Sequence, residues 1–205
     1  LELLDGDKIA ALLASHVVAQ VAHLDDLRPA PTVGVVQTAY ANGASTRHIA
    51  TVLGLDVVFA KTGVKHLHAA ALRFDVAIYF EANGHGMVLF GESFVERLRQ
   101  YQDTSAEAHR RGAAEQLLAM HRTVNQSVGD AMSVLLLTYA VLRHKGWSTA
   151  DWVGMYEDLP SRMLKVSVPD RQQIRTTGDE TKIVAPAQLQ RLVDQAVQGV
   201  GGGPA

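Results

Sequence analysis

Apolar positions in the first half of the chain alternate between a helical spacing and short continuous runs. Behind Asp5 the apolar residues recur every three or four positions, which predicts a capped amphipathic helix: Ile9, Leu12, Leu13, Val17 and Val21. Four runs rich in β-branched and aromatic residues predict buried strands: 32–38, 56–60, 75–80 and 87–90. Helical patterns at 45–53 and 64–73 lie between them. This order predicts an α/β fold, with a mixed, mostly parallel sheet sandwiched by helices and closed by one antiparallel hairpin.

The second half of the chain changes character after Gly91. We expect one long charged helix over 94–125, with its arginines on a solvated face. A more apolar helix should begin at Asp130 and end near Lys145.

The last part of the chain predicts the opening of a second domain. A strand at 163–168 and a helix from Pro186 to Val197 cannot bury a core by themselves. We therefore divide the chain into an α/β domain at 1–158 and an incomplete α+β piece at 159–205. The unpaired strand should pair with another copy of the chain, giving self-association, or be poorly ordered.

Composition narrows the function classes. The 205 residues include 19 basic and 21 acidic side chains, so the cationic surplus of a nucleic-acid binder is missing. There is no cysteine, which excludes disulfides, thiolate metal sites and a cysteine nucleophile; it also fits a reducing compartment, so we expect a cytoplasmic location. The most apolar run, 132–142, is about half of the roughly 20 residues that a spanning helix needs, so no membrane partner is expected. The Leu1 start and the glycine-rich end lead us to expect a piece of a longer chain.

The loop between the third and fourth strands carries the clearest candidate chemistry. Glu81, Asn83 and His85 alternate in sequence, so in an extended conformation their side chains would point the same way. A carboxylate, an amide and an imidazole together could hold a polyhydroxylated ligand. A polar hairpin whose side chains cap their own backbone explains the pattern equally well.

A second candidate lies at 61–68, where a strand ends and a helix begins. Free N–H groups and two lysines at this helix start would favour an anionic or hydroxylated ligand. His66 and His68 point apart on a helix and have no third partner, so we do not expect a metal site. Asp5 to Lys8 is interpreted as a helix cap rather than a metal loop.

Three segments closely resemble one family. These are Val-Val-Gln-Thr-Ala-Tyr-Ala-Asn-Gly at 35–43, Lys-Thr-Gly-Val-Lys-His-Leu-His at 61–68 and Tyr-Phe-Glu-Ala-Asn-Gly-His-Gly at 79–86. They resemble the phosphoacetylglucosamine mutases, the N-acetylglucosamine-phosphate branch of the α-D-phosphohexomutase superfamily. The stretch 159–166 is similar to the entry into that family's last domain. Sister mutases carry serine where Asn83 stands.

The resemblance implies a parent enzyme of four domains. It would be an isomerase, an intramolecular phosphotransferase interconverting N-acetylglucosamine 6-phosphate and 1-phosphate in UDP-N-acetylglucosamine biosynthesis. This sequence corresponds to the third, sugar-binding domain and the start of the fourth. The family's phosphoserine, magnesium and phosphate loops have no counterpart in it, so the resemblance implies no catalytic or metal residue here and magnesium only in the parent. Its partners would be an amino-sugar phosphate and the remaining domains of the parent. The alternative is a non-catalytic interaction module derived from this fold.

The resemblance also assigns roles to individual residues. Glu81 would bridge two adjacent sugar hydroxyls in either order, and Asn83 would recognise the N-acetyl group. His85 would either assist proton transfer or brace the loop. The implied substrate-binding set is Thr62, Gly63, Val64, Lys65, Glu81, Ala82, Asn83 and His85.

Overall fold

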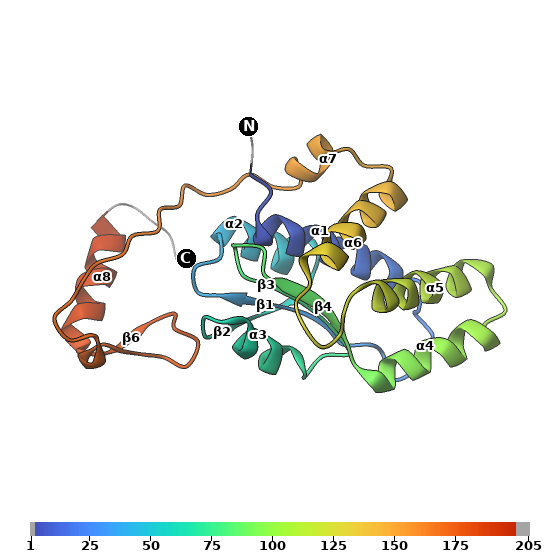
Figure 1. Ribbon diagram of the computed structural model, residues 1–205, viewed down its shortest axis with the longest axis horizontal. Coiled ribbons are helices and arrows are strands. Elements are labelled where there is room, and N and C mark those ends of the chain that lie inside the picture. Colours follow the sequence, from blue (N-terminus) through green and yellow to red (C-terminus); the bar gives the residue numbers. More distant parts are fainter. Residues whose placement is uncertain (1–2, 200–205) are drawn as a thin grey trace.

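The computed structural model describes residues 3–199, in which a four-stranded sheet organises the first 90 residues (Figure 1). The strand order is β2-β1-β3-β4, with bounds Asp56–Ala60, Val33–Thr38, Val76–Phe80 and Gly86–Phe90. Strand β1 pairs in parallel with β2 and β3, and β4 pairs antiparallel with β3. The predicted mixed, mostly parallel α/β sheet is confirmed.

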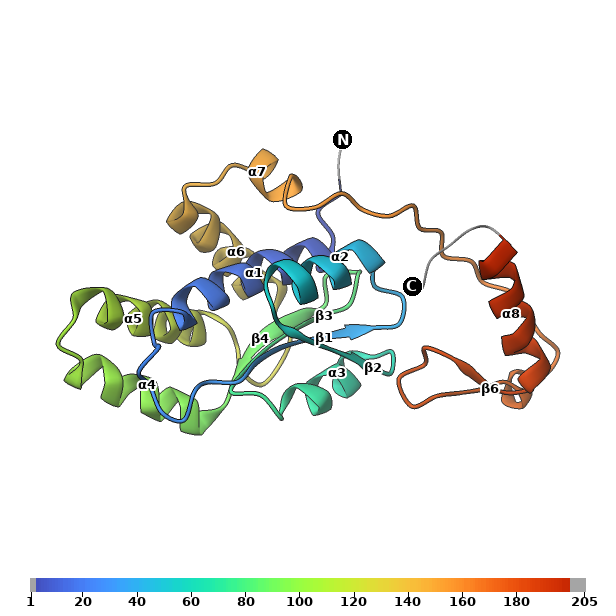
Figure 2. The ribbon, with the colours of Figure 1, turned by 180° about the vertical axis from the view of Figure 1, so that it is seen from behind.

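Helices cover both faces of this sheet (Figure 2). Helix α1 (Gly6–Val21) lies on one face and α3 (Val64–Ala71) on the other. The predicted cap of α1 is confirmed, because the Asp5 side chain accepts a hydrogen bond of 3.0 Å from Lys8 N. The helix predicted after Asn42 is α2 (Gly43–Arg47), which continues as a π-helix over His48–Val52.

The long helix predicted over 94–125 is wrong, because the chain forms a hairpin of two helices. These are α4 (Glu92–Thr104) and α5 (Ala108–Thr123). Ser105 and Glu107 have extended backbones, which breaks the helix and lets both arms face the core. The arginines are not simply solvated either: Arg97 pairs with Asp75 at 2.9 Å.

Helix α6 (Ala131–Lys145) begins and ends where the sequence predicts. Asp130 accepts hydrogen bonds from two backbone amides of the first turn, and Gly146, with φ 65°, ends the helix in the left-handed region. A short helix, α7 (Thr149–Val153), follows behind a capping box and was missed by the apolar pattern. Within residues 3–199, no helix is both long and apolar enough to cross a membrane.

The predicted strand at 163–168 is wrong. This segment is extended and exposed, and it pairs with no neighbouring strand of the described chain, so it makes no ladder. A small unit follows, built from a 3-10 turn (Arg171–Gln173) and a two-stranded antiparallel sheet of β5 (Arg175–Thr176) and β6 (Ile183–Ala185). The expected last helix is α8 (Ala187–Gly199), and it has no buried residue.

Candidate ligand-binding site at the carboxyl ends of the parallel strands

Glu81 stands at the end of β3, where the loops after three parallel strands meet. Its side chain is buried, with 7% of the residue exposed. Oε1 accepts a hydrogen bond of 3.2 Å from Tyr40 Oη, after β1, and one of 3.1 Å from Gly63 N, after β2. Crevices outside the carboxyl ends of such strands are where open α/β sheets bind ligands. The structure thus brings two of the predicted loops together through one carboxylate.

The loop from Glu81 to His85 is a tight turn, so the prediction that alternate side chains align in an extended backbone is wrong. Gly84 N donates to Glu81 O at 2.8 Å, and Glu81 N donates to His85 O at 2.9 Å. Gly84 has φ 89°, a conformation that a side chain would disfavour. Asn83 Oδ1 accepts a 2.8 Å hydrogen bond from His85 N, so this residue caps its own turn. The self-capping interpretation therefore describes Asn83 but not Glu81.

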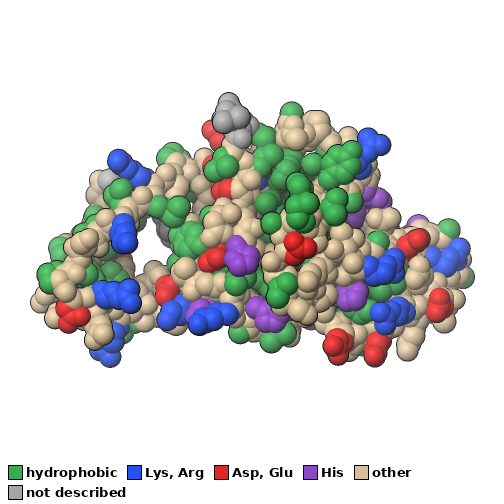
Figure 3. Space-filling model, in the orientation of Figure 1, with side chains coloured by type: hydrophobic (Ala, Val, Ile, Leu, Met, Phe, Trp, Pro, Cys, Tyr) green, Lys and Arg blue, Asp and Glu red, His purple; other side chains and the backbone are tan. Residues whose placement is uncertain are grey.

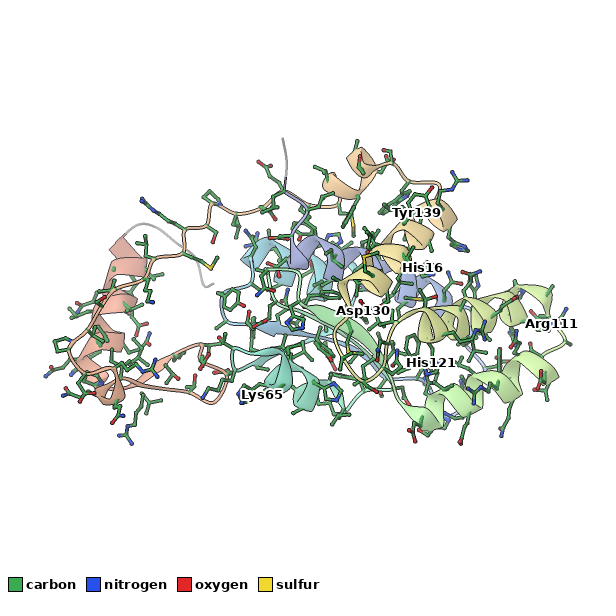
Figure 4. All side chains as sticks on the ribbon, in the orientation of Figure 1. His16, Lys65, Arg111, His121, Asp130 and Tyr139 are labelled. Carbon is green, nitrogen blue, oxygen red and sulfur yellow. The ribbon has the colours of Figure 1, made fainter. Side chains whose placement is uncertain are left out.

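Asn83 and His85 line a separate hollow of about 250 Å³ at the start of α6. The His85 ring lies so close to Gly129 that a Cβ atom there would stand 2.8 Å from Nε2. Figure 4 labels Asp130, which follows Gly129 in the wall of this hollow. The structure therefore places Asn83 and His85 together and Glu81 beside Tyr40 and Gly63.

The turn rests on the first residue of α1, which the sequence did not single out. Gly6 N donates a 3.0 Å hydrogen bond to Ala82 O, and a Cβ at Gly6 would lie 1.9 Å from Glu81 O. No side chain fits at that distance, so glycine is required for α1 to support the loop.

The loop before α3 is held from two sides. Gly63, with φ 114°, donates to Glu81, while Thr62 N donates at 3.0 Å to a carboxylate oxygen of Glu180 from the C-terminal unit. Val64 is half-buried, and Lys65, labelled in Figure 4, is exposed on α3.

The two histidines of α3 do not form a metal site. His68 Nδ1 lies 2.9 Å from Tyr79 Oη, which occupies that ring nitrogen. In the part of the chain that the structure describes, no group of three or more His, Asp or Glu side chains is placed to hold a metal ion.

The pattern at Asp5 to Lys8 predicts only a helix cap, but the structure also buries two charged side chains at this corner of the domain, Asp7 and Lys8. Asp7 is 2% exposed and Lys8 4%. Asp7 Oδ2 accepts a 2.7 Å hydrogen bond from Asn42 N, while its Oδ1 is buried without a partner. Burial raises the pKa of Asp7 to about 6. The helical spacing could have predicted the burial of Asp7, because this residue shares a helix face with three buried alanines, at positions 10, 11 and 14.

This corner fixes the segment that leaves the α/β domain. Asn42 clasps the backbone of Leu159, donating from Nδ2 to its carbonyl at 2.9 Å and accepting from its amide at 3.1 Å. Lys8 Nζ donates to Val153 O and Tyr156 O and lies 3.6 Å above the Tyr156 ring. A larger hollow of about 530 Å³ adjoins Lys8. The buried ammonium group of Lys8 is already bonded to these two carbonyls, so it is not available to a ligand in that hollow. We therefore place the candidate ligand site at Glu81.

A four-stranded sheet with Glu81 at the carboxyl edge of its parallel strands is the arrangement of a domain of the α-D-phosphohexomutase class. Residues 5–147 match the family model described as "Phosphoacetylglucosamine mutase AMG1, domain III", and the chain belongs to this family.

Longer relatives and solved structures resemble almost the whole chain. The phosphoacetylglucosamine mutase of Arabidopsis thaliana is 50% identical over 96% of this chain and 36% of its own length. A solved N-acetylglucosamine-phosphate mutase in a substrate complex superposes with a TM-score of 0.91 at 39% identity, over 97% of this chain and 37% of that one. The Aspergillus fumigatus enzyme, solved with GlcNAc-6P and magnesium, gives 0.90 at 43% identity, over 97% and 36%. The chain thus spans little more than a third of these relatives.

The raised pKa of Asp7 predicts a pH-dependent contribution to folding. The folded state holds this proton up to about pH 6, whereas the ordinary pKa of an exposed aspartate carboxyl is 3.8. Protonated Asp7 therefore contributes stability below about pH 4, and the contribution is lost as pH rises through 6. Between pH 4 and pH 7, wild type should therefore lose about 2 kcal/mol of unfolding free energy that the Asp7→Asn variant, which cannot ionise at this position, keeps. Urea unfolding at both pH values measures this, and an unchanged difference contradicts the raised pKa.

Proposed function

We propose that this chain forms the sugar-binding portion of a phosphoacetylglucosamine mutase, an isomerase that interconverts N-acetylglucosamine 6-phosphate and 1-phosphate. The observation that carries the proposal is the buried Glu81 carboxylate, fixed at the junction of three strand ends in a chain of this family. The Aspergillus fumigatus relative was solved with GlcNAc-6P, which supports an amino-sugar phosphate as the ligand. Within the chain we assign residues 1–158 to this function and residues 159–205 to the start of a further domain, in a cytoplasmic enzyme.

The anchoring of Glu81 suits a ring that must bind in two orientations. Both of its hydrogen bonds go to Oε1, and within residues 3–199 Oε2 accepts none. Oε2 therefore retains its capacity to accept from two adjacent sugar hydroxyls. Because a carboxylate oxygen accepts either hydroxyl equally, the same contact serves the sugar before and after its two ends exchange places.

Asn83 and His85 would extend the proposed contacts from the neighbouring hollow at the start of α6. The Asn83 carbonyl oxygen is engaged by His85 N, so its side-chain N–H groups remain to donate to an acetamido carbonyl. The position of His85 against Gly129 supports bracing of the loop over proton transfer. Four further residues, Thr62, Gly63, Val64 and Ala82, would line the cleft, and Lys65, which is exposed on α3, would also bind the substrate.

Magnesium does not fit the described residues of this chain. Asp5 caps α1 and Asp7 is bonded to Asn42, and these residues form no ligand group with a third acidic side chain within 3–199. The Aspergillus fumigatus relative was solved with magnesium, so we place the ion in parts of the parent enzyme that this chain does not contain.

A segment swap tests the proposed function. The matching third of the Arabidopsis thaliana enzyme is replaced by this chain, and conversion of N-acetylglucosamine 6-phosphate is measured with magnesium. We expect turnover within about tenfold of the parent enzyme, because the swapped segment would bind the sugar as the original one does. The alternative, a non-catalytic interaction module, predicts no turnover. An inactive but folded swap enzyme would favour that alternative. The isolated chain should show no turnover.

In the swap enzyme, Glu81→Ala should lower kcat/KM by about 100-fold, because a site built to bind hydroxyls loses its acceptor. Glu115→Ala, which removes an exposed carboxylate on α5, is the matched control. Steady-state kinetics in which both variants match wild type would remove Glu81 from the site.

Asn83→Ser should reduce the preference for N-acetylglucosamine 6-phosphate over glucose 6-phosphate by about fivefold. Serine keeps an oxygen that can cap the turn but loses the amide donor, and one such hydrogen bond is worth about 1 kcal/mol. The ratio of the two kcat/KM values measures the effect. An unchanged ratio would show that Asn83 has only its structural role.

A further inference from the structure

One carboxylate of the C-terminal unit, which comprises residues 171–199, contacts the loop before α3. Glu180 lies in the turn between β5 and β6, and its Oε2 accepts the 3.0 Å hydrogen bond from Thr62 N. Glu180 has φ 61°, in the left-handed region that non-glycine residues rarely adopt. Such a backbone persists only when its surroundings fix it, and it is found preferentially at functional positions.

The turn that carries Glu180 is internally fixed. Thr177 N donates to Lys182 O at 2.8 Å, and Glu180 N donates to Thr177 O at 3.0 Å. Asp179 accepts from Thr181 N and from the hydroxyls of Thr177 and Thr181. The carboxylate of Glu180 is therefore presented by a pre-formed turn rather than by a loose loop.

Two consecutive amides at the start of α3 hold carboxylates from two different parts of the molecule. Thr62 N is bonded to Glu180 of the C-terminal unit, and Gly63 N to Glu81 of the sugar loop. Hydrogen bonding from Thr62, with nearby Lys61 and His66, keeps the pKa of Glu180 below its usual range, so it is ionised at neutral pH. The loop before α3 thus connects the C-terminal unit directly to the candidate site.

Few other contacts attach the C-terminal unit to the α/β domain. The Glu180–Thr62 bond is the one hydrogen bond that joins described residues 160–199 to residues 3–158. Helix α8 has no buried residue, and the connecting stretch 160–168 is exposed and unpaired. Figure 3 shows an opening between the C-terminal unit and the α/β domain. The unit is therefore held at its root, where Asn42 clasps Leu159, and at its tip by Glu180.

We propose that Glu180 is a positioning residue that latches the C-terminal unit to the loop before α3 and orders the Thr62 amide beside the Gly63–Glu81 hydrogen bond. This contact fixes the tip of the C-terminal unit one residue away from the Gly63–Glu81 hydrogen bond. The proposal extends the proposed function, but the latch itself can be measured without any enzymatic activity.

Amide hydrogen exchange in this chain tests the latch directly. Glu180→Ala should accelerate exchange at Thr62 N by about tenfold, as expected for loss of a hydrogen bond to a charged group. Gly63 N, which remains bonded to Glu81, should change far less and serves as an internal control. Asp194→Asn, which removes an exposed carboxylate of α8, should leave both amides unchanged. Equal protection of Thr62 in wild type and Glu180→Ala overturns the latch.

A distance measurement tests whether Glu180 holds the C-terminal unit in place. The chain contains no cysteine, so Ala69→Cys on α3 and Gln188→Cys on α8 can be spin-labelled cleanly. Wild type should give one narrow distance distribution, and Glu180→Ala a broader and longer one. Glu180→Gly also relieves the positive φ, and it should broaden the distribution as Glu180→Ala does. A broad wild-type distribution, or a narrow one in Glu180→Gly, overturns a latch based on the carboxylate.

The swap enzyme separates this proposal from the proposed function. Glu180→Ala should raise KM for the sugar phosphate several-fold with a smaller change in kcat, while Asp194→Asn matches wild type. Unchanged KM alongside faster Thr62 exchange would overturn the positioning role and leave the proposed function standing. An inactive swap enzyme in which Thr62 exchange responds as expected would refute the proposed function and leave the latch.

Discussion

The hydrogen bonds to Glu81 are the interactions on which the arrangement of the candidate site depends. The carboxylate joins Tyr40 after β1 to Gly63 after β2, while its own residue ends β3. A buried carboxylate is costly unless its lone pairs are satisfied, so these loops are not free to separate. Gly6 supports the same turn from α1. The parallel pairing of β2, β1 and β3 makes the junction possible, because it brings their carboxyl ends to one edge.

The fold could be predicted largely from the sequence because its core strands and helices have clean periodicity. The runs before Thr38, Ala60 and Phe80 are continuous and β-branched, and each became a strand. The prediction of a buried strand at 56–60 is wrong in one respect, because β2 lies at the sheet edge and only Ala60 is buried. Errors arose where an element depends on a partner. The 163–168 segment looks like a strand but lies beside no edge that it could join, and the helix break at Ser105 is marked by neither Gly nor Pro.

The sequence singled out the loops of the candidate site but not their geometry. The family resemblance pointed to the loops around Gly63 and Glu81, and the structure joins them. Alternation could not reveal that the chain turns at Gly84, because a turn and a short extended stretch share the same polar composition. In helix α6, too, the pattern could not predict the geometry, because apolar residues lie on opposite sides of the helix. Leu137 packs inward, whereas Leu136 and Tyr139 are exposed.

The clasp between Asn42 and Leu159 has a consequence for how this domain behaves inside a longer polypeptide. Helix α1 begins at the same corner from which the chain departs after α7, and Asp7 links the two through Asn42. A domain whose first and last residues lie close together can be inserted into a longer chain without distorting that chain at the insertion point. Polypeptide on either side would then share one pivot, so a small rotation there would swing both neighbours together.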